Sequence, residues 1–256
     1  MTTAHPLIEV ELDPENPAQY FACCGLFELA AMFGEVVESA FDYDSNRPRK
    51  ARFSLIDSAL SLSELMRKLK GAQASTLADS GEAPVTLHFV GGATFTLDWW
   101  LEADRSGKSR FKLWAGQQTT LKSLVQPMLA NLSEEADGSL FTTSKIPMSG
   151  RFGLDPRSAW NTLDFGSSVN EQGLDAYTFP AVEMLAAVGL QGFRPKSGAD
   201  RNTHSYRLWR NVLPLAVARA VVSDAFAVSG QTFSFTVEKR SGAYSCFAFA
   251  HPTQGA

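Results

Sequence analysis

The stretch LIEVELDPENPAQYFACCGLFELAAMFG, residues 7–34, decides how the fold begins. Its first six residues alternate apolar and polar side chains, which predicts a strand with one buried face. Asn16 followed by Pro17 predicts a helix N-cap and the first helical position. The run over 18–33 is apolar around most of a helical circumference and closes at Gly34. Such a helix is usually buried, so we expect the chain to open as strand, turn and core helix.

Further along the chain, periodic segments are separated by turn signals. Strands joined by short turns, without regular alternation of strand and helix, favour an α+β fold. We expect a mixed or antiparallel sheet with hairpins at about 85–99 and 233–249, packed by several helices. A single domain over 1–256 is expected, with a candidate sub-boundary near 133–140. The other expected elements are strands over 36–43, 51–56 and 204–209, helices over 64–69 (capped by Ser61 or Ser63), 121–132, 180–190 and 212–222, and a loop over 71–84.

The composition is that of a folded protein. Its 256 residues are 45% hydrophobic and 20% charged, which is near the average of globular domains. No apolar run reaches the length of a membrane span and no signal-peptide pattern is present, so we expect a cytoplasmic protein without membrane contact. Cys23, Cys24 and Cys246 make no disulfide framework and are expected to be reduced. The net charge of −4 argues against a free-standing duplex-DNA binder, so nucleic-acid contact would need a local basic patch.

The sequence contains no recognisable catalytic or metal-binding motif. His5, His88, His204 and His251 lack ligand neighbours at helical or loop spacing. Nucleophile-elbow, phosphate-loop and dinucleotide patterns are absent, so we expect no catalytic residue, metal, cofactor or small-molecule substrate. Two carboxylate pairs could hold a metal, but turn formation and capping explain them better. These pairs are Asp42 with Asp44 and Asp155 with Asp164.

Positive charge interleaved with glycine and aromatic residues is the most distinctive pattern. Basic clusters occur at 47–52, 105–112, 151–157 and 194–210. Arginine dominates the last two clusters, which suits bidentate phosphate contact and stacking. The glutamines at 117–118 stand at an expected helix start, which offers N–H groups to an anion. The candidate nucleic-acid contacts are Arg110, Lys112, Gln117, Gln118, Arg151, Arg157, Trp160, Asn161, Arg194, Lys196, Arg207 and Arg210.

Five segments carry a family resemblance: residues 16–30, 113–118, 150–161 (continued by 170–172), 179–190 and 193–195. Together they resemble the small accessory subunits encoded in type I-U (now I-G) CRISPR loci. The resemblance implies a place in an antiviral effector complex that carries guide RNA, and it transfers no catalytic residue. It leaves open a large-subunit-like or a backbone-like role, although the expected elements show no ferredoxin-like βαββαβ order.

Three functional hypotheses follow. The first is a non-catalytic subunit of a CRISPR ribonucleoprotein that contacts guide RNA, target DNA or neighbouring subunits, since in such complexes base pairing reads sequence while protein reads backbone and shape. The second is a metal-independent endoribonuclease that processes CRISPR RNA, with His204 as general base and Arg207 or Arg210 stabilising the phosphorane. The third is a purely structural subunit that contacts protein alone.

Overall fold

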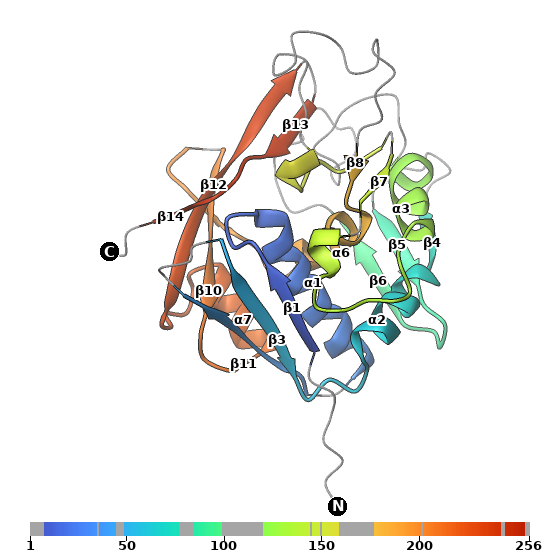
Figure 1. Cartoon of the computed structure of the whole chain (residues 1–256), viewed down its shortest axis with the longest axis horizontal. Coiled ribbons are helices and arrows are strands. Elements are labelled where there is room, and N and C mark those ends of the chain that lie inside the picture. Colours follow the sequence, from blue (N-terminus) through green and yellow to red (C-terminus); the bar gives the residue numbers. More distant parts are fainter. Residues whose placement is uncertain are drawn as a thin grey trace, which may run out of the picture.

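The computed structural model describes residues 8–34, 36–44, 49–76, 84–98, 120–143, 145–148, 150–158, 177–200, 202–241 and 244–253. These residues form an α+β fold, as the sequence predicted, in which antiparallel sheets surround a central pair of helices (Figure 1). The helical elements are α1 (Pro17–Phe33), α2 (Leu62–Lys70), a π-helical turn (Thr120–Val125) that leads into α3 (Gln126–Ala130), α4 (Leu140–Thr143), a 3-10 turn (Pro156–Ser158), α6 (Pro180–Gly192) and α7 (Leu215–Val222).

Within the described ranges, the β structure consists of three sheets and one short strand pair. The first sheet has the order β1-β3-β2-β11, from Ile8–Leu12, Ala51–Ile56, Glu38–Tyr43 and Leu213–Pro214. The second has the order β13-β12-β10-β9, from Tyr244–Phe247, Gly230–Ser241, Thr203–Trp209 and Lys196–Ser197, and β14 (His251–Pro252) pairs with β12. The third has the order β4-β5-β6, from Gln73–Thr76, Val85–His88 and Thr94–Leu97, and β7 (Ile146–Pro147) pairs with β8 (Tyr177–Thr178).

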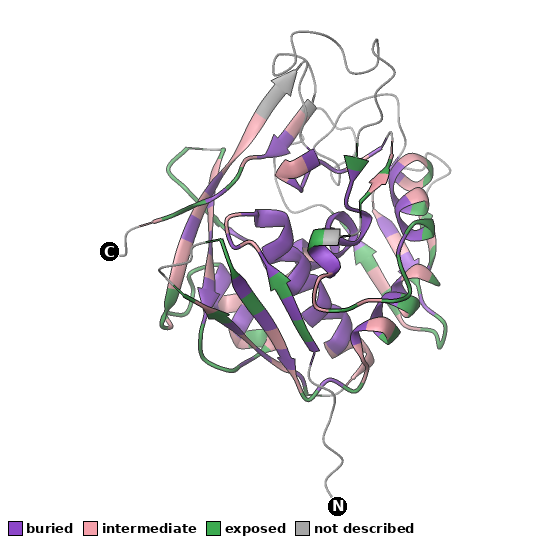
Figure 2. Cartoon of the chain, viewed as in Figure 1, coloured by how far each residue is buried: buried purple, intermediate pink, exposed green. Residues whose placement is uncertain are grey.

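The predicted buried helix is confirmed as α1, which packs directly on α6. The Asn16 side chain caps α1 by accepting the N–H groups of residues 18 and 19, at 3.0 and 3.3 Å. A Cβ atom at Gly25 would lie 1.9 Å from the Leu185 carbonyl oxygen, and one at Gly189 would lie 2.0 Å from that of Phe21. The two backbones therefore touch, and only glycine fits at either crossing point. Figure 2 shows both helices buried along almost their whole length.

Aromatic side chains join α1 to the first two sheets. Tyr20 stacks on Tyr206 of β10 with ring centroids 4.2 Å apart, and Phe41 of β2 meets Trp209 edge-on at 4.8 Å. The polar ends of these rings are also satisfied, because the Trp209 Nε1–H donates to the Ser39 carbonyl oxygen at 3.0 Å. These contacts lock the two sheets to the central helix, with the third sheet on the opposite side of α1 and α6 (Figure 1).

Three expected elements differ from the structure. The expected loop over 71–84 contains β4, because pairing with β5 orders residues of low β-propensity, and Ser75 lies 2.8 Å from His88 Nε2. The expected helix over 121–132 starts as a π-helical turn and ends at Ala130. The helix expected over 212–222 starts at Leu215, because residues 213–214 pair with β2 instead.

The three cysteines are core residues. All three cysteines are free, as predicted, and all three are buried. Burial raises the pKa of the Cys23 and Cys24 thiols well above the ordinary value, so these side chains serve packing rather than nucleophilic chemistry. Within the described ranges, no helix is both long enough and apolar enough to cross a membrane.

Candidate functional site

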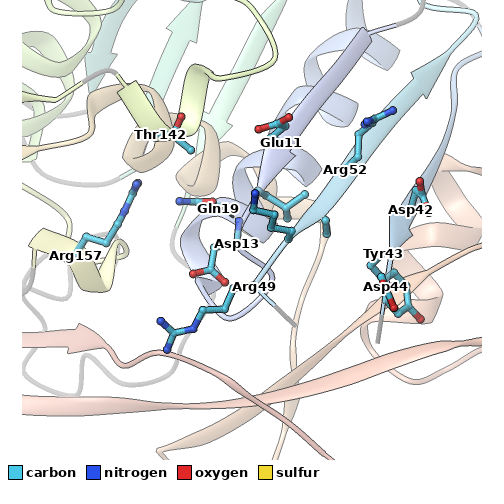
Figure 3. Close-up of a pocket in the computed structure, with 13 residues that line it drawn as sticks. Glu11, Asp13, Gln19, Asp42, Tyr43, Asp44, Arg49, Arg52, Thr142 and Arg157 are labelled. Carbon is cyan, nitrogen blue, oxygen red and sulfur yellow. Dashed lines mark hydrogen bonds between the residues drawn. The ribbon is translucent and has the colours of Figure 1, made fainter. Parts of the chain in front are cut away.

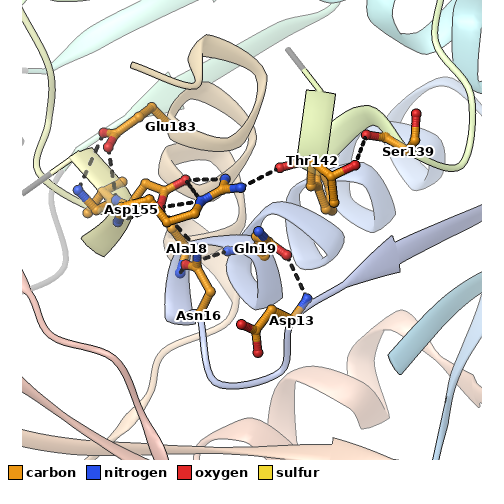
Figure 4. Close-up of polar contacts among 11 residues, drawn as sticks. Asp13, Asn16, Ala18, Gln19, Ser139, Thr142, Asp155 and Glu183 are labelled. Atoms are coloured by element: carbon orange, nitrogen blue, oxygen red, sulfur yellow. Dashed lines mark hydrogen bonds and ion pairs between the residues drawn. The ribbon is translucent and has the colours of Figure 1, made fainter. Parts of the chain in front are cut away.

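The segment Gly150–Ser158 folds inward over the N-terminal ends of both central helices (Figure 4). Gly153 has a φ of +82°, and a Cβ there would lie 2.8 Å from the Ser245 carbonyl oxygen. The Gly153 carbonyl in turn accepts the N–H of Phe247 in β13 at 3.0 Å. A glycine is therefore required where this segment passes the second sheet.

The buried carboxylate of Glu183, in the first turn of α6, organises the segment from within. Its oxygens accept the backbone N–H groups of Phe152, Leu154 and Asp155 at 3.0, 3.4 and 2.9 Å. Burial raises the pKa of Glu183 to about 7, with the Asp155 carboxylate adding to the rise while the N–H donors and Arg151 oppose it. This side chain works as an internal anchor for the loop.

Asp155 links the same segment to the start of α1. Its buried carboxylate accepts the amide of the helix cap Asn16 at 3.0 Å and the backbone N–H of Arg157 at 3.0 Å. This is the turn-forming role that the sequence favoured for Asp155. The Arg157 guanidinium also lies 2.5 Å from Asp155 Oδ2, donates to the Phe141 carbonyl at 2.9 Å and sits 3.5 Å above the Phe179 ring. These contacts engage Arg157 internally, which does not favour the phosphate contact predicted for it.

A groove with a volume of about 530 Å³ crosses the end of the first sheet, where β1 and β2 finish and β3 begins (Figure 3). The basic cluster at 49–52 lines one side, and Arg157 and Thr142 line the other. Figure 3 shows Gln19 and Asp13 between these two sides. The complete lining is Glu11, Leu12, Asp13, Gln19, Asp42, Tyr43, Asp44, Arg49, Lys50, Ala51, Arg52, Thr142 and Arg157.

The net charge in and around this groove is more negative than the number of basic residues in its lining suggests. Four lining cations face four lining carboxylates, but three of the cations already pair with carboxylates outside the lining. Arg49 lies 3.0 Å from Glu15, Arg52 lies 3.6 Å from Glu9, and Arg157 pairs with Asp155. Lys50 is therefore the one lining cation without an ion pair among the described residues, and a single cation beside four carboxylates does not favour phosphate at this position.

The segment 194–210 is placed differently, on the second sheet and its margin. Along β10, buried residues alternate with half-exposed ones, so Ser205 and Arg207 point outward. Lys196 pairs in register with Ser205, which puts it on the same face. Lys196 forms a 2.5 Å ion pair with Asp224, and the Arg207 Nε–H donates to Thr232 across the strand at 3.0 Å.

The first and last arginines of this segment are exposed. Arg194 follows α6, and its Nε–H donates to the Gln191 carbonyl oxygen at 3.3 Å. Arg210 follows β10, lies 4.4 Å from the Tyr43 ring centroid and donates to the Tyr43 carbonyl at 3.1 Å. The structure thus brings Lys196 and Arg207 together, and sets Arg210 apart beside the groove.

Other predicted site residues are either buried or outside the described ranges. His204 is only 2% exposed within β10, and its ring packs 5.6 Å from that of Phe235, so a substrate could reach it only if the sheet opened. Among the described residues no three His, Cys, Asp or Glu side chains gather as a metal site would require. Predictions for the following residues lie outside the described part of the chain: Arg110, Lys112, Gln117, Gln118, Trp160, Asn161 and Asp164.

The sequence interpretation missed three residues that matter in this region. Asp13 was read only as part of a turn, and Gln19 and Glu183 only as members of buried helices. Gln19 and Glu183 stand in otherwise apolar runs of sequence. Because a buried polar side chain needs hydrogen-bond partners, their position could have indicated a polar contact inside the fold. Comparisons with protein-family models, with curated proteins and with solved structures found no match to the chain.

Proposed function

We propose that this protein is a non-catalytic subunit of a type I-U/I-G CRISPR effector ribonucleoprotein in the cytoplasm. It contacts guide RNA or target DNA through the outward cations of the segment 194–210 and leaves the reading of sequence to base pairing. The contacting side chains are Arg194, Lys196, Arg207 and Arg210. Arg151, which is half-buried in the inward segment, is not among them.

The observation that carries the proposal concerns the segments of the family resemblance. Residues 16–30, 150–158 and 179–190 meet in one buried unit, through the Gly25 and Gly189 crossing, the Asn16–Asp155 bond and the Glu183 anchor. The distinctive residues of these segments are thus used to hold the fold. Such use supports a scaffold role, because a rigid unit can present surfaces to partners.

The outward segment supports nucleic-acid contact through its side-chain chemistry. Arg207 lies among hydroxyl groups, since Ser205 pairs with Ser234 and Arg207 with Thr232 across the two strands. Phosphate and sugar contacts in protein–nucleic acid complexes come largely from arginine, lysine, serine and threonine side chains. A short row of such groups on a sheet face is suited to backbone contact rather than base reading.

Crosslinking of the assembled complex tests the proposal. The complex is reconstituted with guide RNA and target DNA, irradiated, and digested for mass spectrometry. We expect nucleotide adducts on peptides from 194–210 and none on 150–158. Adducts on neither segment, with the subunit still bound, would favour the purely structural role. RNA cleavage in chelator by the isolated protein, lost in His204→Ala, would favour the endoribonuclease.

A further inference from the structure

The groove at the end of the first sheet contains carboxylates that form no ion pair with a described residue. Glu11 and Asp42 lie opposite Arg52 in register, one on each side, so the three side chains form a row across β1, β3 and β2. The Arg52 guanidinium leaves this row to pair with Glu9. Glu11, Asp42 and Asp13 form no ion pair within the described part of the chain, and these three carboxylates outnumber Lys50, the lining cation that is also unpaired there.

Asp13 is more buried than Glu11 and Asp42, and its surroundings disfavour the charged form of its carboxyl group. One carboxylate oxygen accepts the Glu15 N–H at 2.9 Å. Burial raises the pKa of Asp13, and the nearby Glu15 carboxylate raises it further, while Arg49 and Arg157 only partly compensate. A carboxylate held in this way gains more from an incoming cation than a fully hydrated one does.

Gln19 provides a second, independent observation at the same place. The residue is 2% exposed and lines the groove, and its Oε1 accepts the Asp13 N–H at 2.7 Å. Its Nε2 donates to no protein group among the described residues. Gln19 lines the groove, so this amide nitrogen is available there to an acceptor such as a carbonyl oxygen.

We propose that this groove binds a basic peptide segment of a partner protein, with an arginine or lysine side chain between Asp13, Glu11 and Asp42 and a peptide carbonyl on Gln19. A peptide supplies both a cation and a carbonyl acceptor. Nucleic acid would bring phosphates to an acidic surface, and a polyamine would bring no acceptor for the amide. The inference rests on the groove and not on the contacts of the segment 194–210, so either can fail without the other.

The test uses the full chain and a fluorescent twelve-residue glycine/serine peptide that carries three arginines. One control probe is the same peptide with citrulline in place of arginine, which keeps the shape of the side chain and removes its charge. A second control probe is a single-stranded RNA of similar length. The groove variant is Asp13→Asn with Asp42→Asn. The control is Glu135→Gln with Asp98→Asn, which removes the same charge from exposed positions outside the groove lining.

We expect the groove variant to weaken arginine-peptide binding by about tenfold or more, the control pair to change it by less than about twofold, and citrulline to abolish it. Equal losses in both variants, or no loss in the groove variant, would overturn the proposal. So would RNA binding that falls in the groove variant alone. Asp13→Asn keeps an oxygen for the Glu15 N–H, so thermal unfolding of the variant should be unchanged or slightly raised, and this separates loss of binding from loss of folding.

Discussion

The segments 150–158 and 194–210 look alike in sequence and are used in opposite ways. Both combine arginine with glycine and aromatic residues. In the first, Arg157 turns back onto Asp155, two residues earlier, and both charges are removed from binding. In the second, Arg207 lies on a strand between buried neighbours, which forces it outward. The comparison teaches that a basic cluster predicts a binding surface where the fold keeps its cations on an outer face, as with Lys196 (54% of the side chain exposed), and not where it turns them inward, as with Arg157 (24% exposed).

The largest expected effect comes from breaking the inward segment. Asp155→Ala leaves the Asn16 amide and the Arg157 guanidinium without their shared acceptor. Removing one partner of a buried ion pair costs about 3–5 kcal/mol of unfolding free energy. Urea denaturation should show this loss, while the exposed Asp98→Ala control stays within about 0.5 kcal/mol of the parent. A small loss for Asp155→Ala would mean that the segment is not anchored through this carboxylate.

The anchor at Glu183 should make stability depend on pH. Its pKa is about 7 in the folded protein and 4.5 in the unfolded chain, so the folded state binds the proton more tightly. The resulting stability is fully present below pH 4.5 and is lost as pH rises through 7, by about 3 kcal/mol in total. Denaturation curves measured between pH 4.5 and 8 should show this fall.

Glu183→Gln is the matching variant, because it removes the titrating group. Its unfolding free energy should lack the fall between pH 4.5 and 7, whereas the exposed control Glu135→Gln should retain it. A fall of the same size in Glu183→Gln would assign the pH dependence to another group.

The smallest effect on stability is expected on the outward segment. Arg210→Ala removes an exposed stack on Tyr43 and one hydrogen bond to its carbonyl oxygen. Substitutions at such positions usually change the free energy of unfolding by less than about 0.5 kcal/mol. Thermal unfolding should therefore shift by only a degree or two. A loss as large as that of Asp155→Ala would show that Arg210 holds the fold and is not reserved for a partner.

Much of the fold could be predicted from local patterns. The structure confirms the strand before Asp13, the helix start at Asn16-Pro17 and the buried helix that ends before Gly34. Each of these depends on neighbouring residues alone, through burial of apolar side chains or capping of the helix. β4 could not be predicted, because the pairing of small polar residues with β5 is a tertiary effect. The inward direction of the Arg157 side chain could not be predicted either, because it depends on contacts with Phe141 and Phe179, which are distant in sequence. The acidic character of the groove depends on three ion pairs that only the folded chain brings together.

The salt dependence of nucleic-acid binding by the assembled complex tests the central claim most directly. The complex is compared with one that carries Lys196→Ala and Arg210→Ala, and with one that carries Arg157→Gln, over a series of salt concentrations. Each lost phosphate contact should lower the slope of log affinity against log salt by about one. We predict that the outward double variant loses about two units of slope, and that Arg157→Gln keeps the parent slope. An unchanged slope in the double variant, with the subunit still in the complex, would contradict the account.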